Sequence, residues 1–253
     1  MTKLEFIELN HELLESMGSY CLRSKKNSKG YRQKNKWLQN RFDEGLKYVQ
    51  IFKNNKQVGF IEYTAAEYSS RVVFANGYLV IHCLWVSEMG QGYGTQLIQK
   101  CLKDAKRLAK KGVVVVTNST TSWTPSKEIL LKNNFQCMDK APYGFELLVY
   151  SFTQELEQPY FPTDWDERIN RYNQLTILRS FQCPYVEVAT ENIVSGAMQL
   201  DLPVEVIDLS DREQIMTLSP TPYGIFSVFY KGQLVTFHRL TVHSVVKKLK
   251  ELR

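Results

Sequence analysis

Residues 78–110 read YLVIHCLWVSEMGQGYGTQLIQKCLKDAKRLAK. The first part, 78–86, is mainly apolar and rich in β-branched and aromatic residues, which predicts a buried strand. A glycine turn follows at 90–94. From there apolar side chains recur at steps of three and four between polar and basic ones, which predicts a helix. The first turn of such a helix offers N–H groups without helical partners and a partial positive charge, so this stretch suits a phosphate or pyrophosphate.

The glycine turn narrows the choice of phosphate ligand. It lacks the Gly-Lys-Ser/Thr of a Walker A loop and the G-x-G-x-x-G of a dinucleotide-binding loop. Gly92-Tyr93-Gly94 after Leu84-Trp85-Val86 instead resembles the acyl-CoA loop of the GNAT superfamily of N-acyltransferases, whose pattern is Arg/Gln-x-x-Gly-x-Gly/Ala after a strand that ends in apolar-x-Val. Met89 stands where that pattern has Arg or Gln. The alternative is a turn that joins strand and helix without a ligand.

Length and composition are those of a globular protein. The 253 residues are 43% hydrophobic and 23% charged, which fits one large or two ordinary domains. The first residues lack a signal-peptide pattern, and no apolar run approaches the ~18 residues of a membrane span. We therefore expect a cytoplasmic protein without a membrane partner. The five cysteines are far apart and include no C-x-x-C pair, so we expect neither a disulfide framework nor a metal site.

The net charge of +6 has two local sources, the segment 23–41 and the segment 103–111 on the helix after the glycine turn. No nucleic-acid recognition motif accompanies either cluster, so we expect solvated basic faces and no nucleic-acid partner. An alternative for the segment 103–111 is that its positive charges create an electrostatic field that favours binding of the phosphates of CoA.

The predicted elements of the N-terminal part follow the GNAT order. They are, in chain order, a strand (4–10), two helices (11–23, 32–44), three strands (46–53, 57–64, 78–86), the helix after the glycine turn, a strand (113–117), a helix (125–134) and two strands (135–139, 143–153). The resemblance thus covers 1–153 and implies an α/β fold built on a mixed α+β sheet. More narrowly, Ile81–Val86, Asp139–Pro142 and Phe145–Leu148 resemble the YoaP-like acetyltransferases of bacteria, which carry a distinct C-terminal domain.

The resemblance implies a reaction and a cosubstrate. Acetyl-CoA is the implied cosubstrate, and a primary amine of a small molecule or a protein is the implied acceptor, attacking the thioester directly. Backbone groups at Leu84, Trp85 and Val86 are implied to position the pantetheine and thioester. The residues implied to receive the pyrophosphate are Gln91, Gly92, Tyr93, Gly94 and Thr95.

An amine acceptor needs a base or a water chain to take its proton. Period-two alternation places His82 on the same strand face as Leu84 and Val86. An imidazole titrates near neutrality, so His82 is a candidate base; a hydrogen-bonded core histidine is the alternative. Glu62 on the neighbouring strand and Glu146 are further candidates.

The general acid is less evident. Many GNAT enzymes use a tyrosine five residues before the Phe that closes the last helix, and here that position is Leu130. Tyr143 and Cys137 are candidates to replace it, and Trp123 is a candidate wall of the substrate site. Because the tyrosine is absent, a noncatalytic CoA-binding module is an alternative function.

The C-terminal part predicts a second, smaller domain. Residues 154–172 hold two prolines and little periodicity, which predicts a connector. The predicted order over 173–253 is strand, helix, strand, helix, strand, strand, helix, which resembles a thioredoxin-like domain. Cys183-Pro184-Tyr185 resembles the active-site turn of that fold, where a helix N-terminus stabilises a thiolate. Val186 replaces the second cysteine, so a dithiol cycle is unavailable, and a thiol or redox-linked role centred on Cys183 is the third functional alternative.

Overall fold

The computed structural model describes residues 4–153 and 157–253. These residues separate into two compact units that do not follow chain order. Among the described residues, the first unit holds 4–20, 38–69, 73–153 and 157–161, and the second holds 21–37, 70–72 and 162–253. Residues 1–3 of the first predicted domain and 154–156 of the predicted connector lie outside the described residues.

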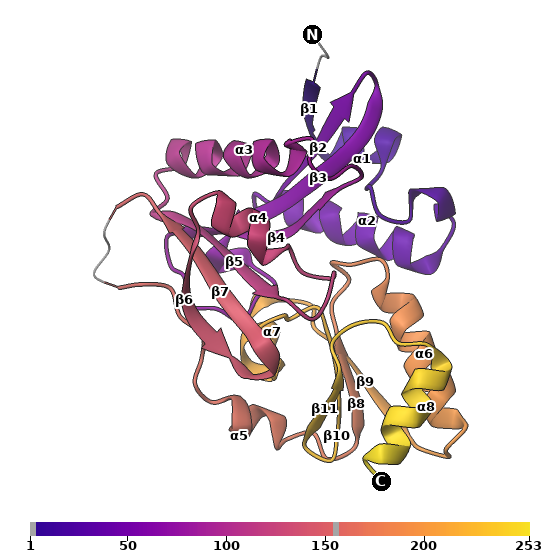
Figure 1. Cartoon of the computed structure of the whole chain (residues 1–253). Coiled ribbons are helices and arrows are strands. Elements are labelled where there is room, and N and C mark those ends of the chain that lie inside the picture. Colours follow the sequence, from indigo (N-terminus) through magenta and orange to yellow (C-terminus); the bar gives the residue numbers. More distant parts are fainter. Residues whose placement is uncertain (1–3, 154–156) are drawn as a thin grey trace. The chain divides into compact units, whose positions relative to one another are not determined.

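A mixed sheet forms the first unit (Figure 1), in the order β1-β2-β3-β4-β5-β7-β6. Its strands are β1 (Leu4–Glu8), β2 (Lys47–Lys53), β3 (Lys56–Ala65), β4 (Tyr78–Val86), β5 (Gly112–Asn118), β6 (Gln136–Ala141) and β7 (Phe145–Ser151). Neighbouring strands are antiparallel except β4 and β5, which are parallel. The mixed α/β sheet expected from the sequence is therefore present.

The helices that begin in the first unit are α1 (His11–Met17), α3 (Tyr93–Arg107) and α4 (Lys127–Lys132). Helix α3 packs across β2, β3, β4 and β5. It buries Leu97, Ile98, Cys101 and Ala105 in the core of this unit, as its three- and four-residue periodicity predicts. The order of strands and helices between 4 and 153 is the predicted one.

Two predicted boundaries are wrong, each for a local backbone reason. Helix α1 begins after Asn10, whose Oδ1 accepts the Leu13 N–H at 2.8 Å, but it ends at Met17 and not at residue 23, because Gly18 adopts a φ of 76°. Tyr143 lies in a short 3-10 turn at 142–144, with a φ of 64°, and not in β7.

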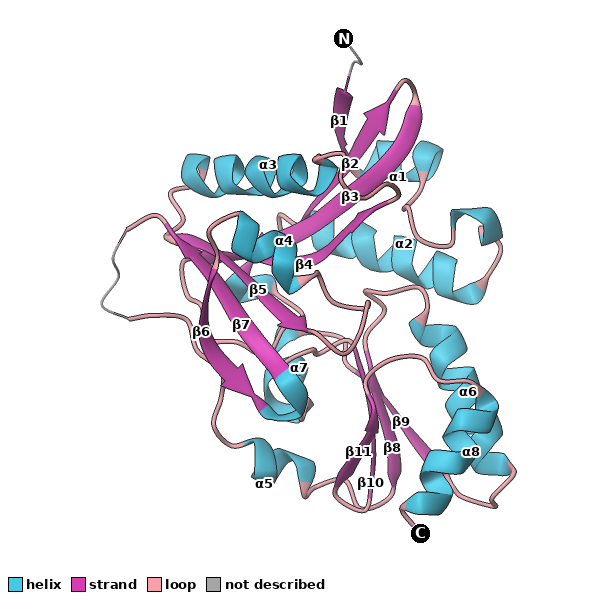
Figure 2. Ribbon diagram, in the orientation of Figure 1, coloured by secondary structure: helices cyan, strands magenta, loops and turns pink. Residues whose placement is uncertain are grey.

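The second unit contains a four-stranded sheet in the order β11-β10-β8-β9. Its strands are β8 (Leu175–Arg179), β9 (Val204–Asp208), β10 (Phe226–Tyr230) and β11 (Gln233–Thr236), and its helices include α5 (Trp165–Ile169), α6 (Val186–Met198), α7 (Arg212–Leu218) and α8 (Val242–Glu251). Strands β8 and β9 are parallel, whereas β10 is antiparallel to β8 and β11. Helices α6 and α8 pack side by side (Figure 2). This arrangement is the thioredoxin-like one expected of the C-terminal part.

Segment 21–37, which includes the start of α2 (Lys29–Phe42), is built into the second unit. The Lys29 ammonium donates to the Glu187 carboxylate, which also accepts from Arg179 Nη1 at 3.3 Å. Gly30 lies so close to the turn before α6 that a Cβ at this position would stand 2.1 Å from the Pro184 carbonyl oxygen. Residues 162–172, inside the predicted connector, are grouped with the same unit and include α5.

Candidate active site

A cavity of about 430 Å³ opens where β4 ends and α3 begins. It is lined by 84–86 at the end of β4, by 88–90 in the turn, and by 92–95 at the start of α3. Residues in and just before α4 complete the wall: Ser126, Glu128, Ile129 and Lys132. Every residue that the sequence assigned to CoA lines this cavity except Gln91, which is exposed in the turn.

Strands β4 and β5 diverge beside the cavity. Their pairing runs from Tyr78 opposite Gly112 to Ile81 opposite Val115, whereas β4 continues to Val86. Strand β5 continues to Asn118 in register with β7. The last residues of β4 therefore lie beyond the described β4–β5 ladder, where their backbone N–H and C=O groups are suited to pair with the amides of an extended ligand.

A β-bulge interrupts the pairing of β4 with β3. Glu62 lies opposite Cys83, and the next residue, Tyr63, lies opposite Ile81, so His82 is an extra residue on β4. Such a bulge bends its strand and increases the local twist. It lies one residue beyond the point where β4 and β5 separate.

The bulge also inverts the alternation of side chains along β4. Leu79 before it and Leu84 and Val86 after it pack against the same core beneath α3. The prediction that His82 shares a face with Leu84 and Val86 is therefore wrong, because the strand gains one residue between them. His82 instead contacts Glu62.

His82 is the centre of a buried hydrogen-bonded triplet. Its Nδ1 lies 3.2 Å from Glu62 Oε1, and its Nε2 lies 3.0 Å from Ser69 Oγ. Ser69 is 0% exposed, and Glu62 and His82 are each 1% exposed. An ionised Glu62 carboxylate would accept from Nδ1–H, and in that tautomer the Ser69 hydroxyl would donate to Nε2. No motif in the sequence marks Ser69, and none of the three residues lines the cavity.

The start of α3 provides a cradle for a diphosphate. Gly92, the N-cap residue, has a φ of 77°, and a Cβ there would meet nothing nearer than Gln96 Nε2 at 4.0 Å. The N–H groups of the first helical turn have no partner within the helix and lie at the positive end of its dipole. Such unpartnered N–H groups at a helix start are the kind of group that binds a phosphate. Gly94 has another role, since a Cβ there would lie 2.3 Å from Ile129 Cδ1, so it allows α3 and α4 to approach each other.

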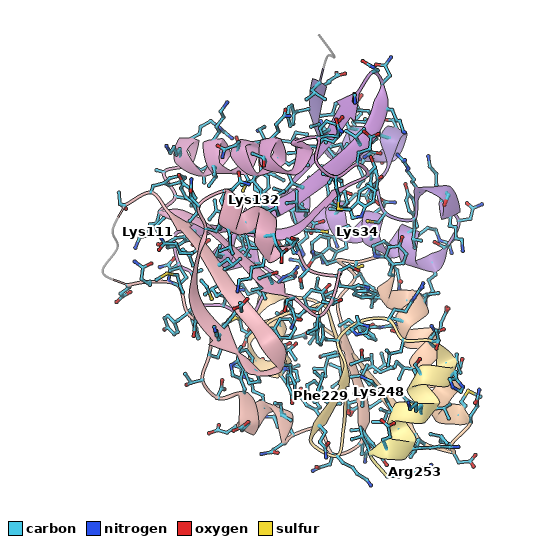
Figure 3. The ribbon with its side chains drawn as sticks, in the orientation of Figure 1. Lys34, Lys111, Lys132, Phe229, Lys248 and Arg253 are labelled. Carbon is cyan, nitrogen blue, oxygen red and sulfur yellow. The ribbon has the colours of Figure 1, made fainter. Side chains whose placement is uncertain are left out.

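The cavity wall carries charges of both signs. Lys132, labelled in Figure 3, contributes a positive charge from the end of α4. Glu88 and Glu128 contribute negative charges. A hydrogen bond from the Ser126 hydroxyl lowers the pKa of Glu128, so this carboxyl is ionised at neutral pH.

The other predicted acid–base residues are not among the cavity-lining residues. Tyr143 is 39% exposed, and its carbonyl oxygen accepts from Asn118 Nδ2 at 2.8 Å. Glu146 forms an ion pair with Lys127 at 2.7 Å. Cys137 Sγ lies 3.8 Å from Glu146 Oε1, and burial raises the pKa of the Cys137 thiol, so this group keeps its proton at neutral pH.

Leu130 and Trp123 occupy positions where the GNAT resemblance implied functional residues. Leu130 is fully buried in the core beneath α3. Its side chain has no proton to donate, and its burial gives it a packing role. Trp123 is half-buried, and it is not among the cavity-lining residues.

Cys183 lies in the turn before α6, and its carbonyl oxygen accepts the Val186 N–H at 3.2 Å. The side chain is half-buried. Burial, followed by the nearby thiols of Cys21 and Cys183, raises the pKa of Tyr185.

Residues 4–153 and 157–253 contain no group of three or more His, Cys, Asp and Glu side chains arranged to hold a metal ion. None of the helices in these ranges is long and apolar enough to cross a membrane.

Two family models match the chain. Residues 11–123 match the acetyltransferase (GNAT) family, and residues 203–250 match the YoaP-like family. A curated relative, the uncharacterized N-acetyltransferase YoaP of Bacillus subtilis (strain 168), is 26% identical over 251 residues. The alignment covers 98% of this chain and 99% of the relative.

Solved acetyltransferases are similar to part of the chain. The PaiA N-acetyltransferase of Thermoplasma acidophilum in complex with coenzyme A is 16% identical, with a TM-score of 0.43, and the match covers 59% of this chain and 99% of that one. For the Campylobacter jejuni N-acetyltransferase PseH in complex with acetyl coenzyme A, the identity is 13%, the TM-score 0.43 and the coverage 60% and 100%. By the family models, residues 11–123 are thus similar to the acetyltransferase (GNAT) family and residues 203–250 to the YoaP-like family.

Proposed function

We propose that this chain is an acetyl-CoA-dependent N-acetyltransferase that acetylates a primary amine of a small molecule or a protein. The observation that carries the proposal is the cavity at which the diverging end of β4, the glycine turn and the start of α3 meet. The GNAT-family match over 11–123 supports it, as does the N-acetyltransferase name of the curated relative.

Two backbone segments would hold the cosubstrate. The residues from Leu84 to Val86 would pair with the amides of the pantetheine arm, and the N–H groups from Gly92 to Thr95 would receive the pyrophosphate. Lys132 would add a positive charge to the phosphate side of the wall. When bound, acetyl-CoA supplies the activated acyl group as a thioester.

His82 and Glu62 are the proposed base pair. An imidazole whose Nδ1–H is held by a carboxylate accepts a proton at Nε2, and the carboxylate stabilises the imidazolium that forms. Both side chains are buried and outside the cavity wall, so the proton of the acceptor ammonium reaches them through intervening hydrogen-bonding groups. With Leu130 in the core, protonation of the thiolate falls to Tyr143, to Cys137 or to water.

The burial of Leu130 also favours a second candidate function, a CoA-binding module without turnover. The two candidates share the cofactor site and differ in whether an amine is acetylated.

Calorimetric titration of acetyl-CoA into the full chain tests the cofactor site. Thr95→Glu places a negative charge on an exposed residue that lines the cavity, and Gln99→Glu places the same charge one turn further along α3, outside the wall. We expect Thr95→Glu to weaken binding at least about tenfold, a loss of about 1.4 kcal/mol, because the carboxylate repels the diphosphate. Gln99→Glu should bind as wild type does.

The titration and an amine screen separate the alternatives. Absence of saturable acetyl-CoA binding to wild type would sink the proposal. If wild type binds, release of free CoA thiol is followed with a panel of polyamines, amino acids and lysine-containing peptides. Binding without acetylation of any amine would favour the noncatalytic module.

A further inference from the structure

Ser69 is a fully buried hydroxyl to which the proposed cofactor site assigns no role. It follows the 3-10 turn Ala66–Tyr68, and its N–H donates to the Ala66 carbonyl oxygen at 3.2 Å. Its Oγ lies 3.0 Å from His82 Nε2, on the side of the ring opposite Glu62. Both ring nitrogens of His82 therefore have a hydrogen-bond partner. The Glu62 carboxylate only accepts hydrogen bonds, whereas the Ser69 hydroxyl both donates and accepts them.

The residues directly after Ser69 are fixed by hydrogen bonds inside the second unit. Arg71, which is 0% exposed, donates from Nη1 to Gln182 Oε1 at 2.8 Å. The Arg71 carbonyl oxygen accepts from Arg212 Nη1 at 2.9 Å. The Val72 N–H donates to the Pro222 carbonyl oxygen at 3.1 Å. The backbone of segment 70–72 is thus held inside the second unit.

Within the acetyl transfer proposed above, on which this inference rests, we propose that Ser69 is a positioning residue for His82. Its hydroxyl donates to Nε2 of the neutral ring, which keeps Nδ1–H directed at Glu62 and Nε2 as the basic nitrogen. When the N–H bond of the acceptor ammonium breaks, the released proton travels through the intervening hydrogen-bonding groups to Ser69 Oγ and forms a new O–H bond there. The O–H bond that pointed at His82 breaks as the Nε2–H bond forms, so the Ser69 hydroxyl then accepts from Nε2–H.

This arrangement meets a specific need of a buried base. A base must exist in two protonation states, and a buried polar group in either state is costly unless it is hydrogen-bonded. A hydroxyl satisfies both states because it reverses its direction without moving its oxygen. A backbone carbonyl or a second carboxylate at the same place would satisfy only the protonated ring.

Nitrogen NMR of the full chain, labelled with ¹⁵N-histidine, tests whether Ser69 positions the His82 ring. The experiment requires no enzymatic turnover. The chain has four histidines, and His82→Gln identifies the signals of His82. We expect wild type to show a protonated Nδ1 and a hydrogen-bonded, unprotonated Nε2. Ser69→Ala should shift the Nε2 signal and mix the tautomers, while Ser69→Thr, or Ser69→Cys if the threonine variant fails to fold, should restore part of the wild-type pattern.

The matched control is Ser219→Ala, which removes another buried hydroxyl, bonded to the Thr221 carbonyl oxygen. It should leave the His82 signals unchanged. Wild-type signals in Ser69→Ala, or a protonated Nε2 in wild type, would overturn the proposal.

Kinetics with an amine found in the screen provide the second readout. We expect Ser69→Ala to lower kcat on the order of ten- to a hundredfold with the KM for acetyl-CoA unchanged, because the base and not the cofactor site is disturbed. An equal loss in Ser219→Ala, or an unchanged kcat, would overturn the role of Ser69. If wild type acetylates no amine, the proposed function fails, and the NMR experiment still decides whether Ser69 positions His82.

Discussion

At the residue scale, Asp104 shows how one buried carboxylate connects α3 with the sheet. The Tyr63 hydroxyl donates to its Oδ2, and Lys100 Nζ lies 2.7 Å from the same oxygen. Burial by itself raises the pKa of Asp104, but the hydrogen bonds from Lys100 and Tyr63 outweigh it, so the pKa lies below the ordinary value of 3.8. The carboxylate is therefore favoured in the folded chain.

This shift predicts a pH-dependent contribution to stability. A carboxyl whose pKa is lower in the folded than in the unfolded state contributes stability above its unfolded value, near about pH 4, and loses it as the pH falls through the folded value. We expect Asp104→Asn to unfold at lower urea concentration than wild type at about pH 7, and the gap in free energy of unfolding to shrink below about pH 4. A gap that stays constant on acidification would contradict the ionic role of Asp104.

Residues were predictable from the sequence where a local motif places them. The glycine turn and the apolar end of the strand predicted residues 84–86 and 92–95, which line the cavity, but not residues 88–90, which line it too; the predicted Gln91 does not. The face of His82 was not predictable, because a bulge depends on the register with a neighbouring strand. Ser69 was missed because its partner is fixed by the tertiary fold and not by spacing along the chain.

At the element scale, the β2–β3 hairpin depends on left-handed backbone conformations. The sequence predicted the two strands, 46–53 and 57–64, and the structure places Asn54 at a φ of 50° and Asn55 at 63° between the paired residues Lys53 and Lys56. Two successive residues with positive φ are typical of the two-residue turns that favour Asn-Gly.

Replacing the second residue of this turn should change stability in opposite directions. We expect Asn55→Gly to stabilise the chain by about 0.5–1 kcal/mol, since glycine adopts positive φ without strain, and Asn55→Ala to destabilise it by about 1 kcal/mol. Urea unfolding measures both. If alanine and glycine had the same effect, the backbone argument would fail.

The contact between α3 and α4 makes a second prediction at this scale. A Cβ on residue 94 would overlap Ile129 Cδ1, so Gly94→Ala should destabilise the chain by about 1–3 kcal/mol. Ile129→Val removes that Cδ1 atom, so the double variant should lose less stability than the two single variants together. Strict additivity in urea unfolding would show that the two side chains do not compete for the same space.

Element order was the most predictable feature of the fold. Apolar periodicity and turn residues are local signals, and they predicted the order of strands and helices along the chain in both parts. Helix ends were less predictable. Helix α1 ends at Met17 because of the conformation of Gly18. The apolar residues after Gly18 continue the helical pattern, so the sequence did not indicate this end.

At the scale of the whole molecule, the two compact units are not continuous segments of the chain. The domains predicted from the sequence were contiguous, 1–153 and 173–253, and joined by the connector 154–172. Segments 21–37 and 70–72 pack instead with residues beyond 162. Contacts such as Lys29 with Glu187 join residues far apart in the sequence, and no periodic pattern reports them.

The chain passes from one unit to the other after residues 20, 37, 69, 72 and 161. A gene fragment that encodes only 162–253 therefore lacks the helix start that packs on Pro184 and the arginine that binds Gln182. If recombination moved this fragment into another protein, the transferred part would lack these contacts of the second unit. We expect the two parts of this chain to be inherited together and to change by matched substitutions, and not to be exchanged as separate cassettes.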